Sequence, residues 1–458
     1  MNPTSSLFPF KDHPRISKHS NSPLPKPLFQ FAISKSQKKD PSSAFELTPN
    51  KPIFQDFSKT SQKPLTRRES NSPPLLNSTH SNSKSNFQFP ISSKQFLLTF
   101  SGHLSSNDQK ELKDYEEVYY FNEKVQVSLS ENLHDSEDGD YIIRTHDHLA
   151  YRYEILQVLG KGTFGQVVKC LDHKRKEEVA VKVIKNKKRF YRQALIELKI
   201  LQKLRQNDRE NNYNVVRIKN YFMFRKHVCI TFELLSLNLF ELIMQNNYEG
   251  LSLTLTHRFA VQILVCLQYI RKYGIVHCDL KPENILLRSP NKPMISVIDF
   301  GSACYETEPK SFYVQSRFYR APEVLLGYKY DYAIDMWSFG CIMAELFTGS
   351  PLFPGESEHH QLLLITSLIG PPPLTLLKKS SKLENFFDSN FDPKPYTTRK
   401  GQEFHPEPKN LANTLDCSNS LFIDFINKCL TWDPDSRIKP LEGLEHPWVA
   451  EGLKRKGS

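Results

Sequence analysis

The segment that decides the fold is His277-Cys278-Asp279-Leu280-Lys281-Pro282-Glu283-Asn284, which follows an amphipathic stretch at residues 256–272. Four of its residues fit the pattern H-x-D-x-K-x-x-N, and a chance match has odds on the order of 10⁻⁵ per start position at average residue usage. A carboxylate, an ammonium group and an amide at this spacing suit phosphoryl transfer, which depends on positioning and on neutralised charge. We expect Asp279 to accept a hydroxyl proton, Lys281 to steady the transferred phosphate, and Asn284 to hold a magnesium ion.

A glycine-rich segment follows the strand-like residues 153–159 and reads Gly160-Lys161-Gly162-Thr163-Phe164-Gly165-Gln166-Val167. Glycines allow backbone N–H groups to approach phosphate oxygens closely. The same spacing could open a dinucleotide-binding unit, in which a helix would follow. Here residues 167–170 and 179–184 continue as apolar strands, so the segment predicts a flap over ATP with Phe164 at its tip.

Lys182 lies within the apolar strand at residues 179–184 and needs a partner, because an unpaired buried charge is costly. Glu197 lies on the apolar face of a helical pattern at residues 189–205 and has the same need. We expect the two residues to pair, and Lys182 to bind the α- and β-phosphates of ATP. The alternative is a lysine whose head reaches solvent and a glutamate on the surface.

A second metal ligand is predicted at Asp299-Phe300-Gly301, which follows an apolar strand at residues 295–298. Asp299 would bind magnesium together with Asn284. The apolar run at residues 230–235 predicts the strand and hinge at which adenine docks; the alternative is an ordinary core strand. The residues expected around ATP are Leu159, Gly160, Gly162, Phe164, Gly165, Val167, Ala180, Lys182, Phe232, Glu233, Leu234, Leu235 and Leu286.

Three acidic or basic residues are expected to be architectural rather than catalytic. Glu323, in Ala321-Pro322-Glu323, is expected to pair with Arg437 far along the chain. Asp335, which precedes Met336-Trp337, is expected to have a structural role as well.

At this point the chain resembles the dual-specificity tyrosine-regulated kinases (DYRK), a family of the CMGC kinases. The resemblance covers residues 145–449, and the box at residues 146–153 indicates the second class of that family. Most kinases carry Arg where this chain carries Cys278. The resemblance implies an α+β, bilobal protein kinase fold with a small β-rich N-lobe and a larger helical C-lobe, ATP and Mg²⁺ as cofactors, and protein substrates. The segments that carry it are 186–194, 277–279, 299–304 and 313–323.

The resemblance also implies regulation and specificity. The kinase would phosphorylate its own Tyr313 once, during maturation, and afterwards Ser and Thr of protein substrates that carry Arg upstream of the target and Pro directly after it. Glu283 and Glu345 are the acids expected to meet that Arg. The family's activation loop carries two tyrosines separated by one residue, whereas this chain has Ser311 at the first position.

Many kinases carry an arginine beside the catalytic aspartate, where it binds the phosphate of a phosphorylated activation loop. This chain has Cys278 at that position. Arg317 and Arg320 lie four and seven residues after Tyr313. A phosphotyrosine brings about −1.5 to −2 charges, which guanidinium groups hold bidentately. The two arginines are therefore expected to clamp phospho-Tyr313; the alternative is that they only solvate the loop.

Composition divides the chain into four parts. Residues 1–92 are rich in Ser, Pro, Asn and Lys, contain no Gly and keep no period of 2 or 3.6, so we expect a disordered tail. Residues 93–150 are expected to form a small accessory element with a helix at 108–115, and residues 100–121 resemble the region that supports autophosphorylation. Residues 151–449 are expected to form the kinase domain and residues 450–458 a basic tail.

The net charge of +11 does not indicate nucleic acid, because residues 1–100 carry 14 Lys and Arg against 5 Asp and Glu, which leaves only +2 for the rest. No apolar run reaches the roughly 18–20 residues of a membrane span, and no secretory pattern begins the chain. The eight cysteines form no C-x-x-C pair, so a reducing compartment is expected, the cytoplasm or also the nucleus. We expect a monomeric catalytic unit that reaches docking partners through its tail.

Two other functions remain open to the sequence. One is a catalytically inactive kinase fold that serves as a scaffold, which the intact set of Lys182, Glu197, Asp279, Asn284 and Asp299 argues against. The other is an active kinase of a neighbouring family, such as the splicing-factor or homeodomain-interacting kinases, which the box at residues 146–153 disfavours.

Overall fold

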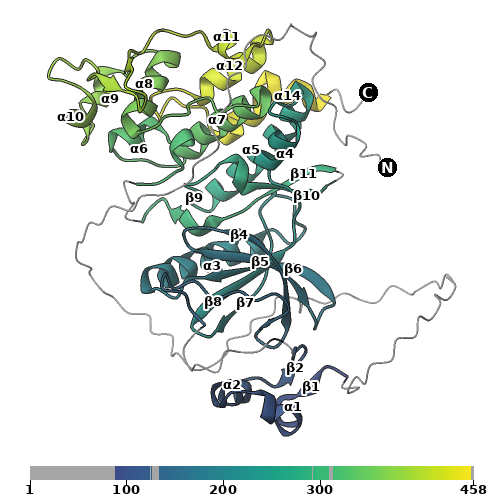
Figure 1. The fold of residues 1–458 in the computed structure, drawn as a ribbon. Helices are drawn as coiled ribbons and strands as arrows, with labels where there is room; N and C mark the ends of the chain where they lie inside the picture. The colour runs from purple at the N-terminus through teal and green to yellow at the C-terminus, as the bar shows by residue number, and fades with distance from the viewer. Residues whose placement is uncertain (1–87, 124, 126–133, 291, 309–312, 455–458) are drawn as a thin grey trace.

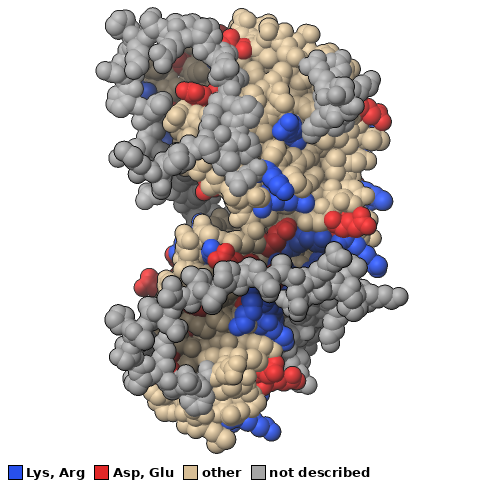
Figure 2. All heavy atoms as spheres, turned by 90° about the vertical axis from the view of Figure 1, so that its right-hand side faces the viewer, with Lys and Arg blue, Asp and Glu red and all other residues tan. Residues whose placement is uncertain are grey.

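The computed structural model describes residues 88–123, 125, 134–290, 292–308 and 313–454. Within these residues two lobes are stacked, and the accessory segment lies at the far end of the smaller one (Figure 1). The predicted disordered tail up to residue 87, Ser311 and the last four residues lie outside the described residues. Lys and Arg side chains are interspersed with Asp and Glu on the face drawn in Figure 2.

The smaller lobe is built on a six-stranded antiparallel sheet with the strand order β3-β4-β5-β6-β8-β7. The register pairs Val167 with Lys182 and Ala180 with Phe232, so the glycine-rich segment, the buried lysine and the hinge strand lie side by side. The predicted strands at 153–159, 167–170, 179–184 and 230–235 all form, although β8 ends at Glu233. The strands are β3 (His148–Leu149), β4 (Tyr153–Lys161), β5 (Gly165–Asp172), β6 (Glu177–Ile184), β7 (Ile218–Phe224) and β8 (His227–Glu233).

Helix α3 (Lys188–Asn207) packs against this sheet and confirms the helix predicted at 189–205. Its buried side chains include Ala194, Leu198 and Leu201, which recur at helical spacing. Glu197 lies on the same buried face, as the sequence pattern predicted.

The accessory element consists of β1 (Ile91–Ser92), α1 (Ser93–Phe100), α2 (Ser106–Glu111) and β2 (Glu117–Val118), with β1 paired to β2. The predicted helix at 108–115 is shorter and starts earlier, because Ser105 and Asp108 form a capping box at its N-terminus. The predicted boundary at residue 93 is also too late: β1 precedes it, and the Phe89 ring lies 6.4 Å from that of Phe96.

The accessory element and the sheet share one hydrophobic cluster, so residues 93–150 are not a separate unit. Strand β3 is an edge strand of the main sheet. The cluster joins Phe96, Phe100, Leu112 and Val118 of the accessory element to Leu149, Tyr151, Phe222 and Phe224 of the lobe.

The larger lobe is helical. Helix α5 (Leu253–Lys272) includes the amphipathic stretch predicted at 256–272. It is long and apolar enough to span a membrane by length and composition, but its side chains Phe259, Ile263 and Leu267 belong to the core of this lobe. Helix α14 (Pro447–Lys454) continues past the predicted start of the tail at 450, since buried Trp448 and Val449 anchor its first turn. The other helices are α4 (Leu239–Gln245), α6 (Pro322–Leu326), α7 (Ala333–Thr348), α8 (Glu358–Ile369), α9 (Leu374–Leu377), α10 (Leu383–Phe386), α11 (Leu411–Leu415), α12 (Ser420–Cys429) and α13 (Pro440–Glu445).

Two short pairs of antiparallel strands flank the catalytic segments between the lobes. Strand β9 (Ile275–Val276) pairs with β12 (Cys304–Tyr305), and β10 (Ile285–Ser289) pairs with β11 (Lys292–Val297), the strand predicted at 295–298. Residues 277–284 therefore connect β9 to β10, and Asp299 lies between β11 and β12. A further pair, β13 (Tyr396–Thr397) with β14 (Glu403–Phe404), lies in the larger lobe.

Candidate active site

Three charged side chains from three different elements meet at the base of the smaller lobe. Lys182 Nζ donates to both carboxylate oxygens of Glu197, at 2.7 and 2.9 Å, and to Oδ1 of Asp299 at 2.8 Å. A Cβ atom at Gly301 would come within 2.9 Å of Asp299 Oδ1, so glycine leaves room for this cluster. The predicted Lys182–Glu197 pair is present, and Asp299 joins it.

Burial and charge act in opposite directions on these groups. Burial opposes the ionised form of Asp299, but the adjacent Lys182 ammonium outweighs it and lowers the pKa of that carboxyl to about 2. Burial likewise disfavours the charged form of Lys182, and the two carboxylates raise its pKa nevertheless. Asp299 is therefore ionised at neutral pH, as a ligand for a cation must be.

The glycine-rich segment turns tightly between β4 and β5. Gly165 has φ +154°, and a Cβ atom there would lie 2.1 Å from the carbonyl oxygen of Val183. Its own carbonyl accepts from the N–H of Gly162 at 2.8 Å. Gly160 and Gly162 face open space, with no heavy atom of the described residues within 4 Å of an added Cβ. The backbone of this turn is therefore accessible to a ligand.

The predicted base, Asp279, is held by two neighbours. Lys281 Nζ donates to Oδ2 at 2.9 Å, while the hydroxyl and N–H of Ser316 donate to Oδ1 at 2.8 and 3.0 Å. Lys281 also donates to the Ser316 hydroxyl at 3.2 Å. Ser316 was not predicted as a site residue; the available signal was its position between Tyr313 and Ala321-Pro322-Glu323.

Buried polar contacts fix the backbone around Asp279. Asp335 accepts from the N–H groups of His277 and Cys278 at 2.8 and 3.1 Å, which confirms its predicted structural role. Cys278 has φ +65° and Asp299 has φ +59°, values that are rare outside glycine and recur at functional sites. His277 joins the two segments, since its Nε2 lies 3.0 Å from the carbonyl oxygen of Ile298.

The donor atoms of Asn284 and Asp299 suit Mg²⁺. Asn284 Nδ2 donates to the carbonyl oxygen of Asp279 at 2.9 Å, which leaves its amide oxygen as the atom available to a cation. Asp299 contributes an ionised carboxylate. Mg²⁺ prefers such oxygen ligands, so the residues present fit the ion.

The predicted hinge joins the two lobes directly. Ser236 N–H donates to the carbonyl oxygen of Leu287, and Leu287 N–H donates to that of Leu237, both at 2.8 Å. These bonds place β10, which carries Leu286, against the end of the hinge. Phe232 is buried in the strand opposite Ala180, in keeping with a bulky residue at the back of the predicted adenine pocket.

The loop with Tyr313 lies beside the two predicted arginines. Tyr313 is 69% exposed, and the Arg320 guanidinium lies 4.5 Å from its ring centroid. Arg320 is also bound to Glu358 at 2.7 Å and to the carbonyl oxygen of Gln315. Arg317 donates to the carbonyl oxygen of Glu356 at 2.8 Å, and its Nε has no partner within the described part of the chain.

Glu283 and Glu345 lie close enough to influence each other. Burial raises the pKa of Glu345 to about 7, with Glu283 adding to the rise and the Tyr319 hydroxyl opposing it. That hydroxyl donates to Glu345 at 2.7 Å. Oε2 of Glu283 is buried and has no hydrogen-bond partner among the described residues. The pair therefore has unused capacity for a cation.

The predicted pairing of Glu323 with Arg437 is present and fully buried. Arg437 donates to both carboxylate oxygens, at 2.7 and 2.9 Å, and both side chains are inaccessible to solvent. This contact links α6 to the loop before α13.

Comparison with known proteins agrees with this geometry. The family described as "Protein kinase domain" matches residues 153–449. Dual specificity tyrosine-phosphorylation-regulated kinase 4 of Homo sapiens is 47% identical over 80% of this chain and 72% of its own length. The chain belongs to the dual-specificity tyrosine-phosphorylation-regulated kinases. The DYRK-family kinase pom1 of Schizosaccharomyces pombe is 44% identical over 79% of the chain, but the match spans 34% of that relative. For kinase 2 of Drosophila melanogaster, at 48% identity, the match spans 51%.

The fold class and the enzyme class expected from the sequence are thereby confirmed: this is a protein kinase of the dual-specificity type, with the two-lobed fold.

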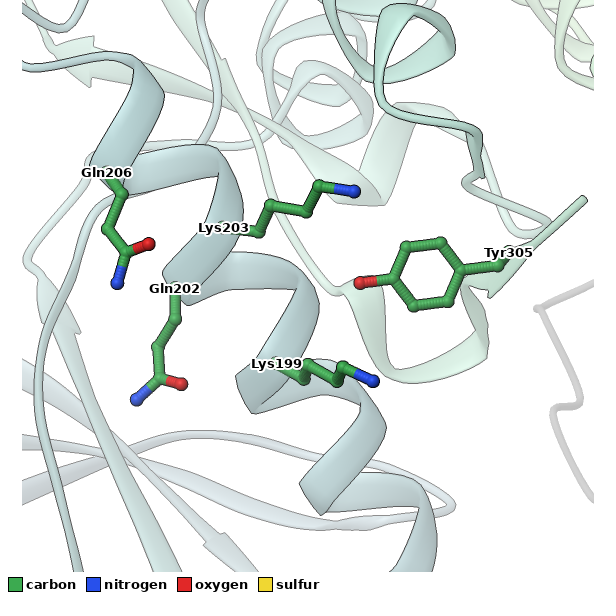
Figure 3. Close-up of a pocket in the computed structure, with 5 residues that line it drawn as sticks. All are labelled: Lys199, Gln202, Lys203, Gln206 and Tyr305. Atoms are coloured by element: carbon green, nitrogen blue, oxygen red, sulfur yellow. The ribbon is translucent and has the colours of Figure 1, made fainter.

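A surface hollow of about 500 Å³ on the outer side of α3 adds a feature that the sequence did not reveal (Figure 3). Lys199 and Lys203 lie 5.8 and 5.3 Å from the Tyr305 ring centroid. These contacts tie the helix that carries Glu197 to β12, next to the catalytic segments.

Proposed function

We propose that this kinase transfers the γ-phosphoryl group of ATP to protein hydroxyls with Asp279 as the base. The observation that carries the proposal is the position of Asp279, whose two oxygens are oriented by Ser316 and Lys281. Asp279 would accept the proton of the attacking hydroxyl, while Lys281 would steady the γ-phosphate. Lys182, oriented by Glu197, would bind the α- and β-phosphates. Asn284 and Asp299 would hold Mg²⁺, which neutralises phosphate charge when bound.

The proposed substrate of maturation is Tyr313 of the same chain, followed by Ser and Thr of other proteins. Tyr313 is exposed and lies three residues before Ser316, which contacts the base. We further propose that Arg317 and Arg320 clamp phospho-Tyr313. Cys278 cannot serve as a cation, because a cysteine side chain carries no positive charge in either protonation state, and it is fully buried.

The clamp is tested with Arg317→Gln and Arg320→Gln at matched Tyr313 phosphorylation. Arg320 already binds Glu358 and the backbone, so its loss would disturb the loop as well. Arg317→Gln is the sharper variant, because its Nε is unused. We expect each variant to lower activity and the preference for Pro after the target. Wild-type rates and Pro preference in both variants would contradict the clamp.

A preference for Arg upstream of the target is proposed from Glu283 and Glu345. Two adjacent carboxyl groups, one with an unpartnered buried oxygen, offer a guanidinium both charge and hydrogen-bond acceptors.

A monomeric catalytic unit in the cytoplasm, with access to the nucleus, remains our proposal for the state and location of the protein. Docking partners would bind the N-terminal tail.

The experiment that tests the proposal is mass spectrometry of recombinant protein, wild type beside Asp279→Asn. The wild-type protein is expected to carry phosphate on Tyr313 and to phosphorylate Ser or Thr in a peptide library enriched for Arg and Pro. Asp279→Asn should show neither modification. Phosphate on Tyr313 in the Asp279→Asn protein would contradict autophosphorylation by this site.

A further inference from the structure

The loop at residues 135–141, which we call the brace loop, packs against the glycine-rich segment from outside the kinase domain predicted by sequence. Asp140 is its central residue, and its side chain is only 3% exposed. The carboxylate lies 2.9 Å from Lys161 Nζ and 3.5 Å from Lys185 Nζ. Lys161 stands between Gly160 and Gly162, in the turn proposed to hold the phosphates.

The second lysine connects the brace loop to the tip of the same turn. Lys185 N–H donates to the carbonyl oxygen of Phe164 at 2.9 Å. A single buried carboxylate therefore contacts one residue of the glycine-rich turn directly and a second residue that holds its tip.

Backbone contacts fix the brace loop itself. The carbonyl oxygen of Gly139 accepts from Asn186 N–H at 2.8 Å, and that of Tyr141 accepts from Gln166 Nε2 at 2.7 Å. Asp135 binds Asn186 and His227, each at 2.8 Å. The brace loop is thus anchored to β5, to the β6–α3 connection and to β8, which makes it a fixed support.

We propose that the brace loop positions the glycine-rich turn for the nucleotide through the ion pair of Asp140 with Lys161, so that Asp140 is a positioning residue for ATP. A glycine-rich turn in open space has high conformational freedom, and ordering it on ligand binding costs free energy. The ion pair restricts that freedom before the nucleotide arrives. The inference rests on the proposed phosphate-binding role of the glycine-rich segment.

The test compares Asp140→Asn, Lys161→Met and their double variant in the full chain. Lys161 is 59% exposed, so the pair is a partly solvated one with a modest effect. We expect each single variant to raise the KM for ATP and the Kd for Mg-ADP by about threefold to fivefold, which corresponds to about 0.7–1 kcal/mol. The KM for a peptide substrate should stay unchanged. The double variant should match Asp140→Asn alone, because Lys161→Met removes one of the two lysine contacts that Asp140→Asn already removes.

Glu137→Gln is the matched control, since it removes one negative charge from an exposed position in the same loop. It should leave nucleotide binding at the wild-type level. The inference is overturned if Asp140→Asn behaves like this control, or if the two single effects add in the double variant. If Asp140→Asn lowers the melting temperature, Lys161→Met still tests the inference, because the Lys161 side chain is mostly exposed. A wild-type protein that binds no nucleotide would instead refute the proposed function.

Discussion

Replacing Lys182 with Arg should remove phosphotransfer while leaving the fold intact. Lys182 Nζ makes three charge-assisted hydrogen bonds, at 2.7, 2.9 and 2.8 Å, from one point between two carboxylates. A planar guanidinium on a longer arm cannot bridge Glu197 and Asp299 from that point and also meet a phosphate. A misplaced cation would lose its charge-assisted hydrogen bonds to the α- and β-phosphates, at about 1.5–3 kcal/mol each, so the loss of both raises the barrier to transfer by about 3–6 kcal/mol. This corresponds to a rate at least about a hundredfold lower.

The assay is steady-state phosphorylation of a peptide, with a thermal melt to confirm that the variant is folded. Lys169→Arg is a suitable control, because Lys169 lies on the neighbouring strand β5 and forms only a partly exposed ion pair with Glu178. The control should keep wild-type activity. If Lys182→Arg keeps more than about a tenth of wild-type activity, the assignment of Lys182 to the phosphates is wrong, since a tenfold loss reflects only about 1.4 kcal/mol.

Three further predictions concern stability, pH and the accessory element. Arg437→Ala should lower the free energy of unfolding by about 3–5 kcal/mol, measured in urea, because it leaves Glu323 as a buried unpaired charge; a loss below about 1 kcal/mol would contradict this. Burial and Glu283 raise the pKa of Glu345 to about 7, so the charged fraction of Glu345 should rise about tenfold from pH 6 to 8. The selectivity for an Arg peptide over an Ala peptide should rise with it. Glu345→Gln should make this selectivity independent of pH over the same range. Deletion of residues 1–90 should leave peptide phosphorylation intact, whereas deletion of 1–145 should prevent Tyr313 phosphorylation, as read by mass spectrometry; full phosphorylation of the shorter protein would refute the second statement.

The contacts that could be predicted from the sequence include one in which a buried charged residue requires a partner of opposite charge. A lysine in an apolar strand requires an acid on a buried helix face, and Lys182 indeed pairs with Glu197. Glu323 was expected to pair with Arg437, more than a hundred residues away, and this contact is present. Apolar runs and glycine spacing were sufficient to predict the individual strands around the glycine-rich segment.

The features that could not be predicted depend on contacts between distant segments whose residues show no pattern in the sequence that points to a partner. Ser316 is an ordinary loop serine until the fold brings it within 2.8 Å of Asp279. Asp140 likewise reads as one acid in an acidic stretch. The fold brings it to Lys161, because β4 and β5 pair Lys161 with Gln166, and the Gln166 side chain holds the carbonyl oxygen of Tyr141. Two residues before the predicted boundary at residue 93 are a related case: Phe89 and Ile91 are partly buried against the accessory element, Phe89 beside Phe96 and Ile91 opposite Val118.

The accessory element and the kinase domain are held together by charge as well as by apolar packing, which bears on how truncation would act. Arg225, in the turn between β7 and β8, binds Asp108 at 2.9 Å and Glu111 at 3.1 Å, and its side chain is 5% exposed. Removal of residues 1–145 would take away both acids and uncover the apolar surface of Tyr151 and Phe224. It would also remove Asp140 from the glycine-rich turn. We therefore expect the accessory element to influence autophosphorylation by shaping the N-lobe that binds ATP, with no need for direct contact with Tyr313.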